Sequence, residues 1–425
     1  MVDVKPFRGI RYTKKAGNIA NLIAQPYDKI DEEMQKEYYE KSEYNYCRLT
    51  LPIEEDRYNI ARKRLEEWLT NEILQKDDKP AFYVYFQEFQ LFGKMYIRKG
   101  FIGALRLHPF EENIVLPHEK THKGPKIDRL NMLKTTKHTL EPGFILYSDK
   151  DKETIRIFEE LTQKEEPIID VGDSLGARNR VWKLTDPEQI KKVQEIFNGQ
   201  QLVIADGHHR YETACTYRDM RREEKKDWDE NDAFNFRMTY LVPVEDEGLV
   251  VLATHRCLAK EKVTPEQEET FKKYFDINKI SKEEIPEFLE KNIGKHVFIY
   301  YQDGIAKSMI IKDPSTINEF VQDRSNEYKK LDVVILRDMI FQGIMGLSDL
   351  KIDDDIFYER WWNEAIQKVD EGKYKVAFIL NPTRAEQVLA VAKNHERMPQ
   401  KSTDFYPKMI SGLTMMSLED GEKLN

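Results

Sequence analysis

The order of apolar and polar residues switches between patterns typical of helices and patterns typical of strands. In residues 32–40 and 58–74 apolar side chains recur every three or four positions, which predicts two amphipathic helices. In residues 81–89 and 96–107 the apolar spacing is close to two, with Gly93 between the runs, and this predicts a β-hairpin. Both kinds of element in one stretch favour a mixed α/β fold.

A strand followed by a helix is predicted in the middle of the chain. Asp186 and Pro187 are typical of a helix start, and Gly199 is typical of the residue just past its end. Residues 201–204 then form a short apolar run, and residues 209–222 have a helical pattern. Asp206-Gly207 is therefore the predicted turn between a strand and a helix.

The second half of the chain repeats the mixture of elements. The patterns predict strands at residues 238–244, 249–253, 296–301, 305–311 and 376–380, and helices beginning at Thr264-Pro265 or lying at residues 332–345, 358–369 and 384–393. Neither an internal repeat nor a low-complexity linker is found. We expect three lobes, at residues 1–165, 166–245 and 246–425, from the usual size of domains.

Composition narrows the classes of function. With 425 residues, 40% of them hydrophobic, the chain can bury a large core, and its formal charge of -9 comes without a long basic tract. We therefore expect no nucleic-acid partner. Cys47, Cys215 and Cys257 are too widely spaced for a disulfide framework or a cysteine zinc site. No secretory signal or membrane-spanning run is present, so a cytoplasmic protein without a membrane partner is expected.

The segment Asp206-Gly207-His208-His209-Arg210, called the DGHHR turn below, is the first candidate site. The first amides of a helix have no partner inside the helix and carry the positive end of its dipole, so they bind anions. Gly207 lets a ligand approach the backbone, and a guanidinium can hold two phosphate oxygens. The turn is therefore predicted to bind an anion, with phosphate favoured.

The second candidate is a charged loop at residues 116–129, which contains His118-Glu119-Lys120-Thr121-His122 and ends at Arg129. As written, this is the HExxH pattern of zinc hydrolases, in which two histidines one helical turn apart share the metal. Gly124-Pro125 would interrupt such a helix. The alternative is a loop that positions a phosphoryl group and deprotonates a hydroxyl.

Two further segments carry suitable chemistry. Residues 398–408 combine lysines with hydroxyls, in Lys401, Ser402, Thr403 and Lys408, and the alternative for this segment is a packed C-terminal turn. Asp28 follows Pro26-Tyr27 at an expected extended turn. We expect the DGHHR turn to face residues 117–129 and residues 398–408 across one cleft.

Five motifs in this order resemble the domain of unknown function 1015 family over essentially the whole chain. They are Phe7-Arg8-Gly9, Pro26-Tyr27-Asp28, Pro117-His118-Glu119-Lys120-Thr121, residues 205–213 and residues 398–408. The DGHHR turn also resembles the turn of the ParB and sulfiredoxin superfamily, in which free-serine kinases hold the transferred phosphate. The resemblance implies a ParB/sulfiredoxin-like core with additional mixed α/β lobes.

The same resemblance implies a kinase that phosphorylates free L-serine with pyrophosphate, ATP or ADP as donor. Neither a GxxxxGK[ST] loop nor a kinase-type GxGxxG is present, which suits a small donor such as pyrophosphate. Phosphoryl transfer also predicts Mg²⁺, with Asp206 as its protein ligand. The rival functions are a ParB-like nucleic-acid-binding or nuclease-like protein, against which the acidic balance argues, and the zinc hydrolase.

Roles are assigned on this basis. Glu119 is the first choice as general base and Asp206 the second, with His209 as a further catalytic candidate. The expected phosphate- and substrate-binding residues are Gly207, His208, Arg210, His118, Lys120, Thr121, Asp28, Arg129, Lys401, Ser402, Thr403 and Lys408. The sequence leaves the oligomeric state open.

Overall fold

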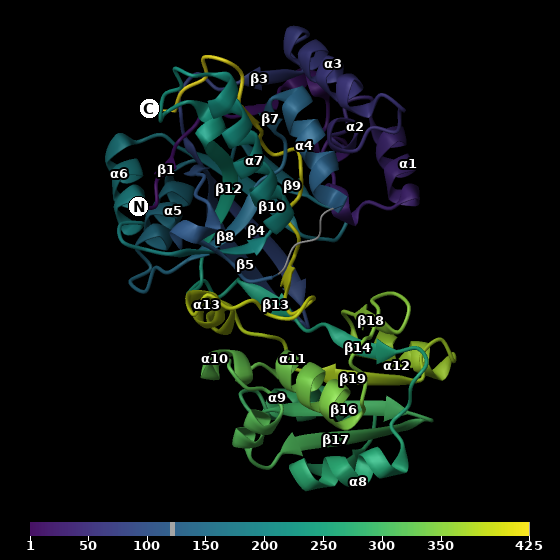
Figure 1. The fold of residues 1–425 in the computed structure, drawn as a ribbon. Helices are drawn as coiled ribbons and strands as arrows, with labels where there is room; N and C mark the ends of the chain where they lie inside the picture. Colours follow the sequence, from purple (N-terminus) through teal and green to yellow (C-terminus); the bar gives the residue numbers. More distant parts are fainter. Residues whose placement is uncertain (120–123, 425) are drawn as a thin grey trace. The chain divides into compact units, whose positions relative to one another are not determined.

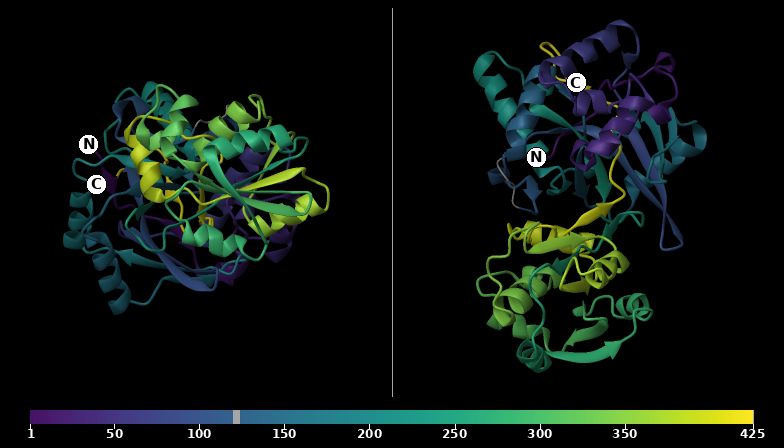
Figure 2. Two further views of the ribbon diagram at one scale, coloured as in Figure 1. Left: turned by 90° about the horizontal axis from the view of Figure 1, so that it is seen from below. Right: turned by 90° about the vertical axis from the view of Figure 1, so that its right-hand side faces the viewer.

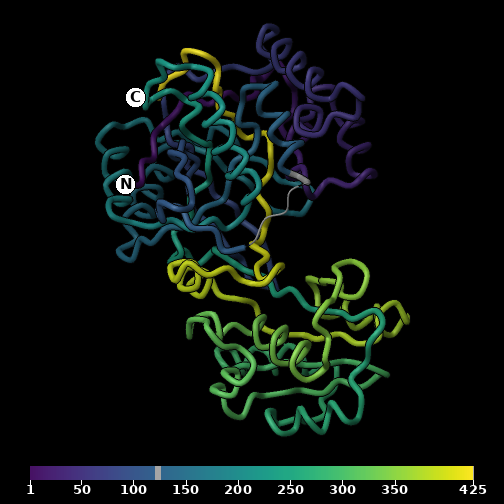
Figure 3. Tube along the Cα trace, viewed as in Figure 1, coloured from purple at the N-terminus to yellow at the C-terminus, as the bar shows by residue number. Residues whose placement is uncertain are grey.

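The computed structural model describes residues 1–119 and 124–424, and these form two compact units. Unit 1 contains residues 1–117, 124–250 and 407–424, and unit 2 contains residues 118–119 and 251–406. The mixed α/β class predicted from the sequence is confirmed (Figure 1). The division differs from the three expected lobes, because residues 1–165 and 166–245 contribute strands to one sheet and the C-terminal segment belongs to unit 1 (Figure 3).

Unit 1 contains most of the strands of the described chain. Its strands are β1 (Val4–Lys5), β2 (Ile10–Tyr12), β3 (Leu74–Lys76), β4 (Phe82–Leu91), β5 (Lys94–Arg106), β6 (Val115–Pro117), β7 (His138–Thr139), β8 (Gly143–Tyr147), β9 (Ile169–Gly172), β10 (Arg178–Leu184), β11 (Leu202–Asp206), β12 (Phe236–Pro243) and β21 (Met416–Ser417). Its α-helices are α1 (Glu32–Lys41), α2 (Cys47–Thr50), α3 (Arg57–Thr70), α4 (Gly124–Thr136), α5 (Glu153–Lys164), α6 (Pro187–Ile196) and α7 (His208–Glu224). Short 3₁₀ helices are η1 (Lys14–Ala16), η2 (Ile19–Asn21), η3 (Tyr27–Lys29), η4 (Phe110–Glu112) and η5 (Ala233–Asn235).

The main sheet of unit 1 is mixed. Its strand order is β6-β11-β8-β12-β5-β4-β10-β9, and β1 also pairs with β5. The pairs β6/β11 and β8/β12 are parallel, and the other pairs are antiparallel. The predicted hairpin is confirmed as β4 and β5, joined through Phe92-Gly93, both with positive φ. Strand β11 lies between two neighbours, so the DGHHR turn begins inside the sheet rather than at its edge.

Two apolar clusters hold unit 1 together. In the first, side chains of α5, α6 and α7, such as Phe158, Val193 and Tyr211, pack with sheet residues such as Phe101 and Trp182. The second cluster joins α1, α2 and α3 to β2 and β3. Burial of each apolar side chain contributes about 1.5–3 kcal/mol. The first cluster therefore fixes α7, and with it the DGHHR turn, against the sheet.

Unit 2 has a sheet of its own. Its strands are β14 (His255–Leu258), β15 (Phe275–Ile280), β16 (Val297–Gln302), β17 (Ile305–Ile311), β18 (Ile356–Glu359), β19 (Val376–Leu380) and β20 (Asp404–Tyr406), and β20 pairs with β13 (Val250–Leu252). Its helices are α8 (Pro265–Tyr274), α9 (Ile285–Lys291), η6 (Pro314–Glu319), α10 (Asn326–Lys329), α11 (Asp332–Val334), the π-helix η7 (Ile335–Ile344), α12 (Trp362–Asp370) and α13 (Ala385–Lys393).

The six-stranded sheet of unit 2 is antiparallel, in the order β15-β17-β16-β19-β14-β18. Alternate residues of a strand point to opposite faces. Ile299 and Tyr301 of β16 therefore pack with α9 and α12, whereas Tyr300 contacts Phe271 of α8 on the other face. Helices thus cover both faces of this sheet (Figure 2).

Most predicted elements are confirmed, and the differences have local causes. The Asp186 cap of α6 and the Thr264 capping box of α8 form as expected. The helix predicted at residues 358–369 is wrong in its first turn, because Tyr358 pairs with Arg256 in the ladder between β18 and β14. Long-range strand pairing overrides a local helical pattern there.

Gly100 tests the close packing of the main sheet. A Cβ atom at Gly100 would lie 2.4 Å from the backbone oxygen of Leu241 on β12, whereas one at Gly172 on β9 would meet nothing within 4 Å. We expect Gly100→Ala to lower the free energy of unfolding by about 1–3 kcal/mol, because the backbone has to shift. Gly172→Ala, the control, should change it by less than about 0.5 kcal/mol. Denaturant unfolding measures both, and equal stabilities would contradict the packing described.

Candidate functional site

The DGHHR turn has the predicted strand–turn–helix geometry. Strand β11 ends at Asp206, Gly207 caps the helix with a φ of 87°, and α7 begins at His208. Positive φ favours glycine, and a Cβ atom here would also lie 3.0 Å from Nε of Arg210. The first intrahelical bond runs from Tyr211 N to Gly207 O at 2.9 Å, so the amides before Tyr211 point toward the N-terminal end of the helix.

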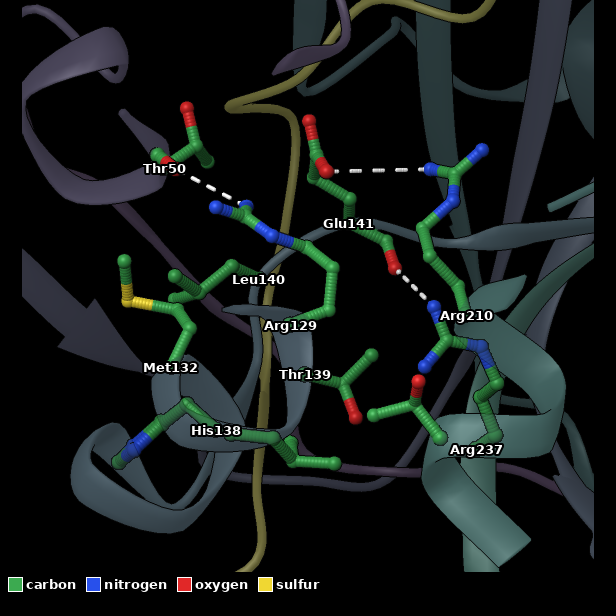
Figure 4. A pocket seen from close by; sticks show the side chains of 11 residues that line it. Thr50, Arg129, Met132, His138, Thr139, Leu140, Glu141, Arg210 and Arg237 are labelled. Carbon is green, nitrogen blue, oxygen red and sulfur yellow. Dashed lines mark hydrogen bonds and ion pairs between the residues drawn. The ribbon is translucent and has the colours of Figure 1, made fainter. Parts of the chain in front are cut away.

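Arg210 is buried beneath this turn. Its Nη1 donates to the backbone oxygen of Pro142 at 3.2 Å and lies 3.8 Å from Oε2 of Glu141, and its Nη2 lies 3.9 Å from Oδ2 of Asp206 (Figure 4 shows the pair with Glu141). Burial disfavours the charge, but the carboxylates of Glu141 and Asp206 outweigh it and raise the pKa of Arg210. The guanidinium is therefore a permanent cation held from two sides.

Asp206 lies in a cationic environment. Its Oδ1 accepts a hydrogen bond from the amide of Gly207 at 2.8 Å, and its Oδ2 lies 3.5 Å from Nζ of Lys408. Burial would raise the pKa of this carboxyl, but Lys408, Arg210, His208 and Lys29 together hold it well below its usual range. Asp206 is thus ionised at neutral pH and binds protons poorly.

A second segment reaches the same place from the N-terminal part of unit 1. The amide of Tyr27 on η3 and the hydroxyl of Ser411 both donate to Oε1 of Glu141, at 3.0 and 2.8 Å. Asp28 follows Tyr27 and is one of the charges that raise the pKa of Arg210. The predicted segments 26–28, 206–210 and Lys408 are therefore brought together.

Arg129 is also near this cluster but already has protein partners. Its Nη1 donates to the backbone oxygen of Thr50 at 3.0 Å, it forms an ion pair with Asp128, and its guanidinium lies 4.0 Å from the ring centre of Tyr27. These contacts hold the 27–29 turn against α4. A phosphate-binding role for Arg129 stays a prediction.

His118, Glu119, Lys401, Ser402 and Thr403, which were also predicted, lie in unit 2. Nε2 of His118 is 3.0 Å from Oγ1 of Thr403, and the backbone oxygen of His118 accepts from Met398 N at 2.8 Å. The hydroxyl of Ser402 donates to Pro399 O at 2.5 Å, and the backbone oxygen of Lys401 accepts from Arg256 at 3.1 Å. The structure therefore places His118 and Glu119 beside the 398–403 segment. One cleft that joins them to the DGHHR turn stays a prediction, because it involves both units.

Part of the second candidate lies outside the described residues, namely Lys120, Thr121 and His122. His118 and Glu119 follow β6 and precede α4, and neither is in a helix. The helical HExxH arrangement therefore does not form at its first two positions. Among residues 1–119 and 124–424, no three His, Cys, Asp or Glu side chains are grouped so as to hold a metal ion.

Sequence reasoning missed three residues of this cluster, namely Glu141, Arg237 and Lys29. The Nη2 of Arg237 donates to the backbone oxygen of Glu141 at 3.0 Å, and burial together with Arg210 lowers the pKa of Arg237 to about 9. One signal was available: Arg237 is the single charged residue in β12, a strand whose residues are all buried. A charge in such a strand indicates a buried electrostatic role.

A family model supports the resemblance seen in the sequence. The model described as "Protein of unknown function (DUF1015)" matches residues 4–334, which is more than half of the chain. The chain belongs to this family. The family description names no activity, and no curated protein matches the chain.

Several solved structures are similar to the chain at low sequence identity. A free serine kinase variant in complex with AMP is 11% identical with a TM-score of 0.35, covering 72% of this chain and 88% of that chain. A conserved hypothetical protein from Pyrococcus furiosus is 15% identical with a TM-score of 0.32, covering 72% and 93%. SbnI with a C-terminal truncation, from Staphylococcus aureus, is 7% identical with a TM-score of 0.36, covering 76% and 90%. Similarity at this level assigns no activity to the DUF1015 chain.

The structure also bears on the membrane prediction. None of the helices in the described part of the chain combines the length and the apolar character needed to cross a bilayer.

Asp206→Asn tests the electrostatics of the turn. The folded-state pKa of Asp206 lies below its unfolded value of about 3.9, so its ionised form stabilises the fold above that pH, and this contribution is lost as the pH falls toward the folded-state pKa. We expect the variant to be less stable by about 1 kcal/mol at pH 7, with the difference from the original chain shrinking below pH 4.

The control for this experiment is Asp219→Asn, on the same helix. Asp219 is an exposed carboxylate paired with Arg218 at 2.7 Å, and its loss should change stability by less than about 0.5 kcal/mol. Denaturant unfolding at pH 7, 5 and 3 measures both variants. If the loss of stability caused by Asp206→Asn is the same at all three pH values, the assigned direction of the pKa shift is refuted.

Proposed function

We propose that the chain is a small-molecule phosphotransferase that phosphorylates the hydroxyl of free L-serine. The observation that carries the proposal is the DGHHR turn, in which the N-terminal end of a 17-residue helix meets the buried cation Arg210 and the amine of Lys408. A helix N-terminus with a guanidinium and an ammonium around it suits the charge of a transferring phosphoryl group. The resemblance of this turn's sequence to that of free-serine kinases supports the same reaction.

In the proposed reaction the donor's phosphates lie at the first turn of α7. The expected contacts are the amides of His208 and His209, at the start of the helix, and the cations Arg210 and Lys408. A donor as small as pyrophosphate fits a site built from one helix end and side-chain cations, and ATP and ADP remain the alternatives.

The chemical step is a simple displacement. The hydroxyl oxygen of L-serine attacks the donor's terminal phosphorus, the bond from that phosphorus to the bridging oxygen breaks, and the hydroxyl proton passes to a carboxylate. With pyrophosphate the products are O-phosphoserine and orthophosphate. Asp206 suits this proton transfer poorly, since its lowered pKa makes it a weak base at neutral pH. Glu119 is therefore the proposed base.

Asp206 is better suited to hold a cation. Mg²⁺ commonly binds one or two carboxylates together with phosphate oxygens and water, and Oδ2 of Asp206, next to the helix end, is the carboxylate oxygen offered here. A bound Mg²⁺ would offset the charge on the donor's oxygens. Arg210 and Lys408 would orient the donor in either case.

A direct assay tests the reaction. The protein is incubated with L-serine and Mg²⁺ together with pyrophosphate, ATP or ADP in separate reactions, and O-phosphoserine is measured by mass spectrometry. We expect product with at least one donor, and with none when EDTA is added. Absence of product in every reaction would refute the proposal.

Arg210→Ala should lower kcat/KM by on the order of a hundredfold or more, because it removes a buried cation from the turn. Arg210→Lys keeps the charge but loses the two-sided contacts, and intermediate activity is expected. Arg178→Ala is the control, since Arg178 is an exposed residue of β10 paired with Asp170. Circular dichroism verifies folding, and full activity in a folded Arg210→Ala protein would contradict the role of Arg210.

Lys408→Met should act mainly on donor binding. Its Nζ lies 3.5 Å from Asp206, and the side chain is largely buried. We expect the KM for the phosphate donor to rise about tenfold, with a smaller change in the KM for L-serine. Lys423→Met, which removes an exposed lysine paired with Asp229, should leave both constants unchanged. Equal effects on both substrates would argue against a donor contact.

A further inference from the structure

A small cavity of unit 1 lies beside the buried arginines. Its volume is about 50 Å³, enough for a few water-sized groups. Its polar lining includes Arg129, Arg210, Arg237, Glu141 and Thr213, and its apolar lining includes Met132, Leu133 and Leu140. Figure 4 shows the three arginines and Glu141 among the residues around it. The cavity therefore combines charged groups with an aliphatic surface.

Two polar atoms of the cavity lining lack partners. Nε of Arg237 and Oγ1 of Thr213 are buried, and neither has a hydrogen-bond partner among residues 1–119 and 124–424. Both side chains are more than nine-tenths buried, with exposures of 5% and 4%. A buried donor without a partner lowers stability, and native proteins rarely keep one that nothing satisfies. Two of them in the lining of one cavity indicate an occupant that accepts hydrogen bonds.

The charges of the cavity lining do not balance. Arg210 and Arg237 are both buried, and Glu141 is the carboxylate among the residues that line the cavity. Asp206 and Asp28 are further acids near Arg210, but neither lines the cavity, and Asp206 is itself paired with Lys408, as Arg129 is with Asp128. Among the residues that line the cavity, the arginine charges therefore outnumber the carboxylate. Burial, and after it the charge of Arg210, lowers the pKa of Arg237.

We propose that this cavity binds the α-carboxylate of the amino acid whose hydroxyl is phosphorylated. The proposal rests on the proposed function and names how its acceptor is recognised. A carboxylate supplies a negative charge against this excess, and its oxygens can accept from Nε of Arg237 and Oγ1 of Thr213. A phosphate dianion suits the cavity less well, because it would bring a second negative charge beside Glu141.

Glu141 makes the match specific for an amino acid. Its Oε1 accepts from Tyr27 N and the Ser411 hydroxyl, whereas among residues 1–119 and 124–424 its Oε2 has the 3.8 Å approach of Arg210 alone. An α-ammonium group beside Oε2 would complete the charge pattern of a zwitterion. A simple hydroxy acid would supply the carboxylate without the ammonium group, and an amino alcohol would supply the ammonium group without the carboxylate.

Arg210 connects this cavity with the DGHHR turn. The same guanidinium lines the cavity and lies 3.0 Å from where a Cβ atom of Gly207 would be. An acceptor with its carboxylate in the cavity is therefore held next to the turn that would carry the donor. This arrangement selects short acceptors such as serine, in which carboxylate and hydroxyl are separated by two carbon atoms.

Thr213→Val tests the proposal with little change of volume. We expect it to raise the KM for L-serine about tenfold, with kcat nearly unchanged, and to leave the KM for ethanolamine, which lacks the carboxylate, as it was. Arg237→Met should raise the KM for L-serine on the order of a hundredfold and reduce the protein's preference for L-serine over ethanolamine. Thr216→Val is the control, since Thr216 is exposed one turn further along α7 and bonds to Glu212 O.

Calorimetric titration with L-serine, in the absence of a phosphate donor, separates this proposal from the reaction. If no phosphorylation is found but L-serine binds and Thr213→Val weakens it, the cavity assignment stands and the kinase assignment fails. If phosphorylation is found and Thr213→Val changes L-serine and ethanolamine equally, or neither, the cavity assignment fails. No L-serine binding in either protein would also overturn it, and the cavity would then hold water only.

Discussion

The geometry of this site depends on one buried guanidinium. Arg210 bonds to Pro142 O, faces the carboxylates of Glu141 and Asp206, and fills the space beneath Gly207. A buried charge is tolerated only when it is paired and hydrogen-bonded, so these contacts fix where α7 begins relative to the segment before β8. Because a Cβ atom at position 207 would crowd the same side chain, the turn and the arginine constrain each other.

The position of a second buried arginine, Arg237, lowers the stability of the fold. Arg237 lies near Arg210, and two like charges in a buried place destabilise each other. The protein could relieve this with an apolar residue on β12, where all other positions are uncharged. A destabilising charge beside a cavity is typical of binding sites, where residues that bind a ligand commonly lower the stability of the fold.

The sequence predicted those parts of the site that local signals determine. The strand, glycine and helix of the DGHHR turn follow from residues adjacent in the chain, and the structure forms them where expected. Glu141 and Arg237 are paired by the register of β8 and β12, which are far apart in sequence. The local sequence pattern therefore could not predict this pair. The burial of Arg129 by Thr50 and Tyr27 has the same long-range origin. The order of the strands in the sheets could not be predicted from the sequence, because it depends on such pairing.

The C-terminal segment shows how a site can use a residue far from its other parts. Lys408 belongs to unit 1, although residues 251–406 separate it from the rest of that unit. Its backbone oxygen accepts from Gln87 at 3.2 Å, and the preceding oxygen, of Pro407, accepts from the buried Arg98 at 2.7 Å. The hairpin of β4 and β5 therefore holds the main chain of this segment, which leaves the amine of Lys408 to face Asp206. A cation held in this way needs little reorganisation when a charged ligand arrives, which is what electrostatic stabilisation of a phosphoryl group requires.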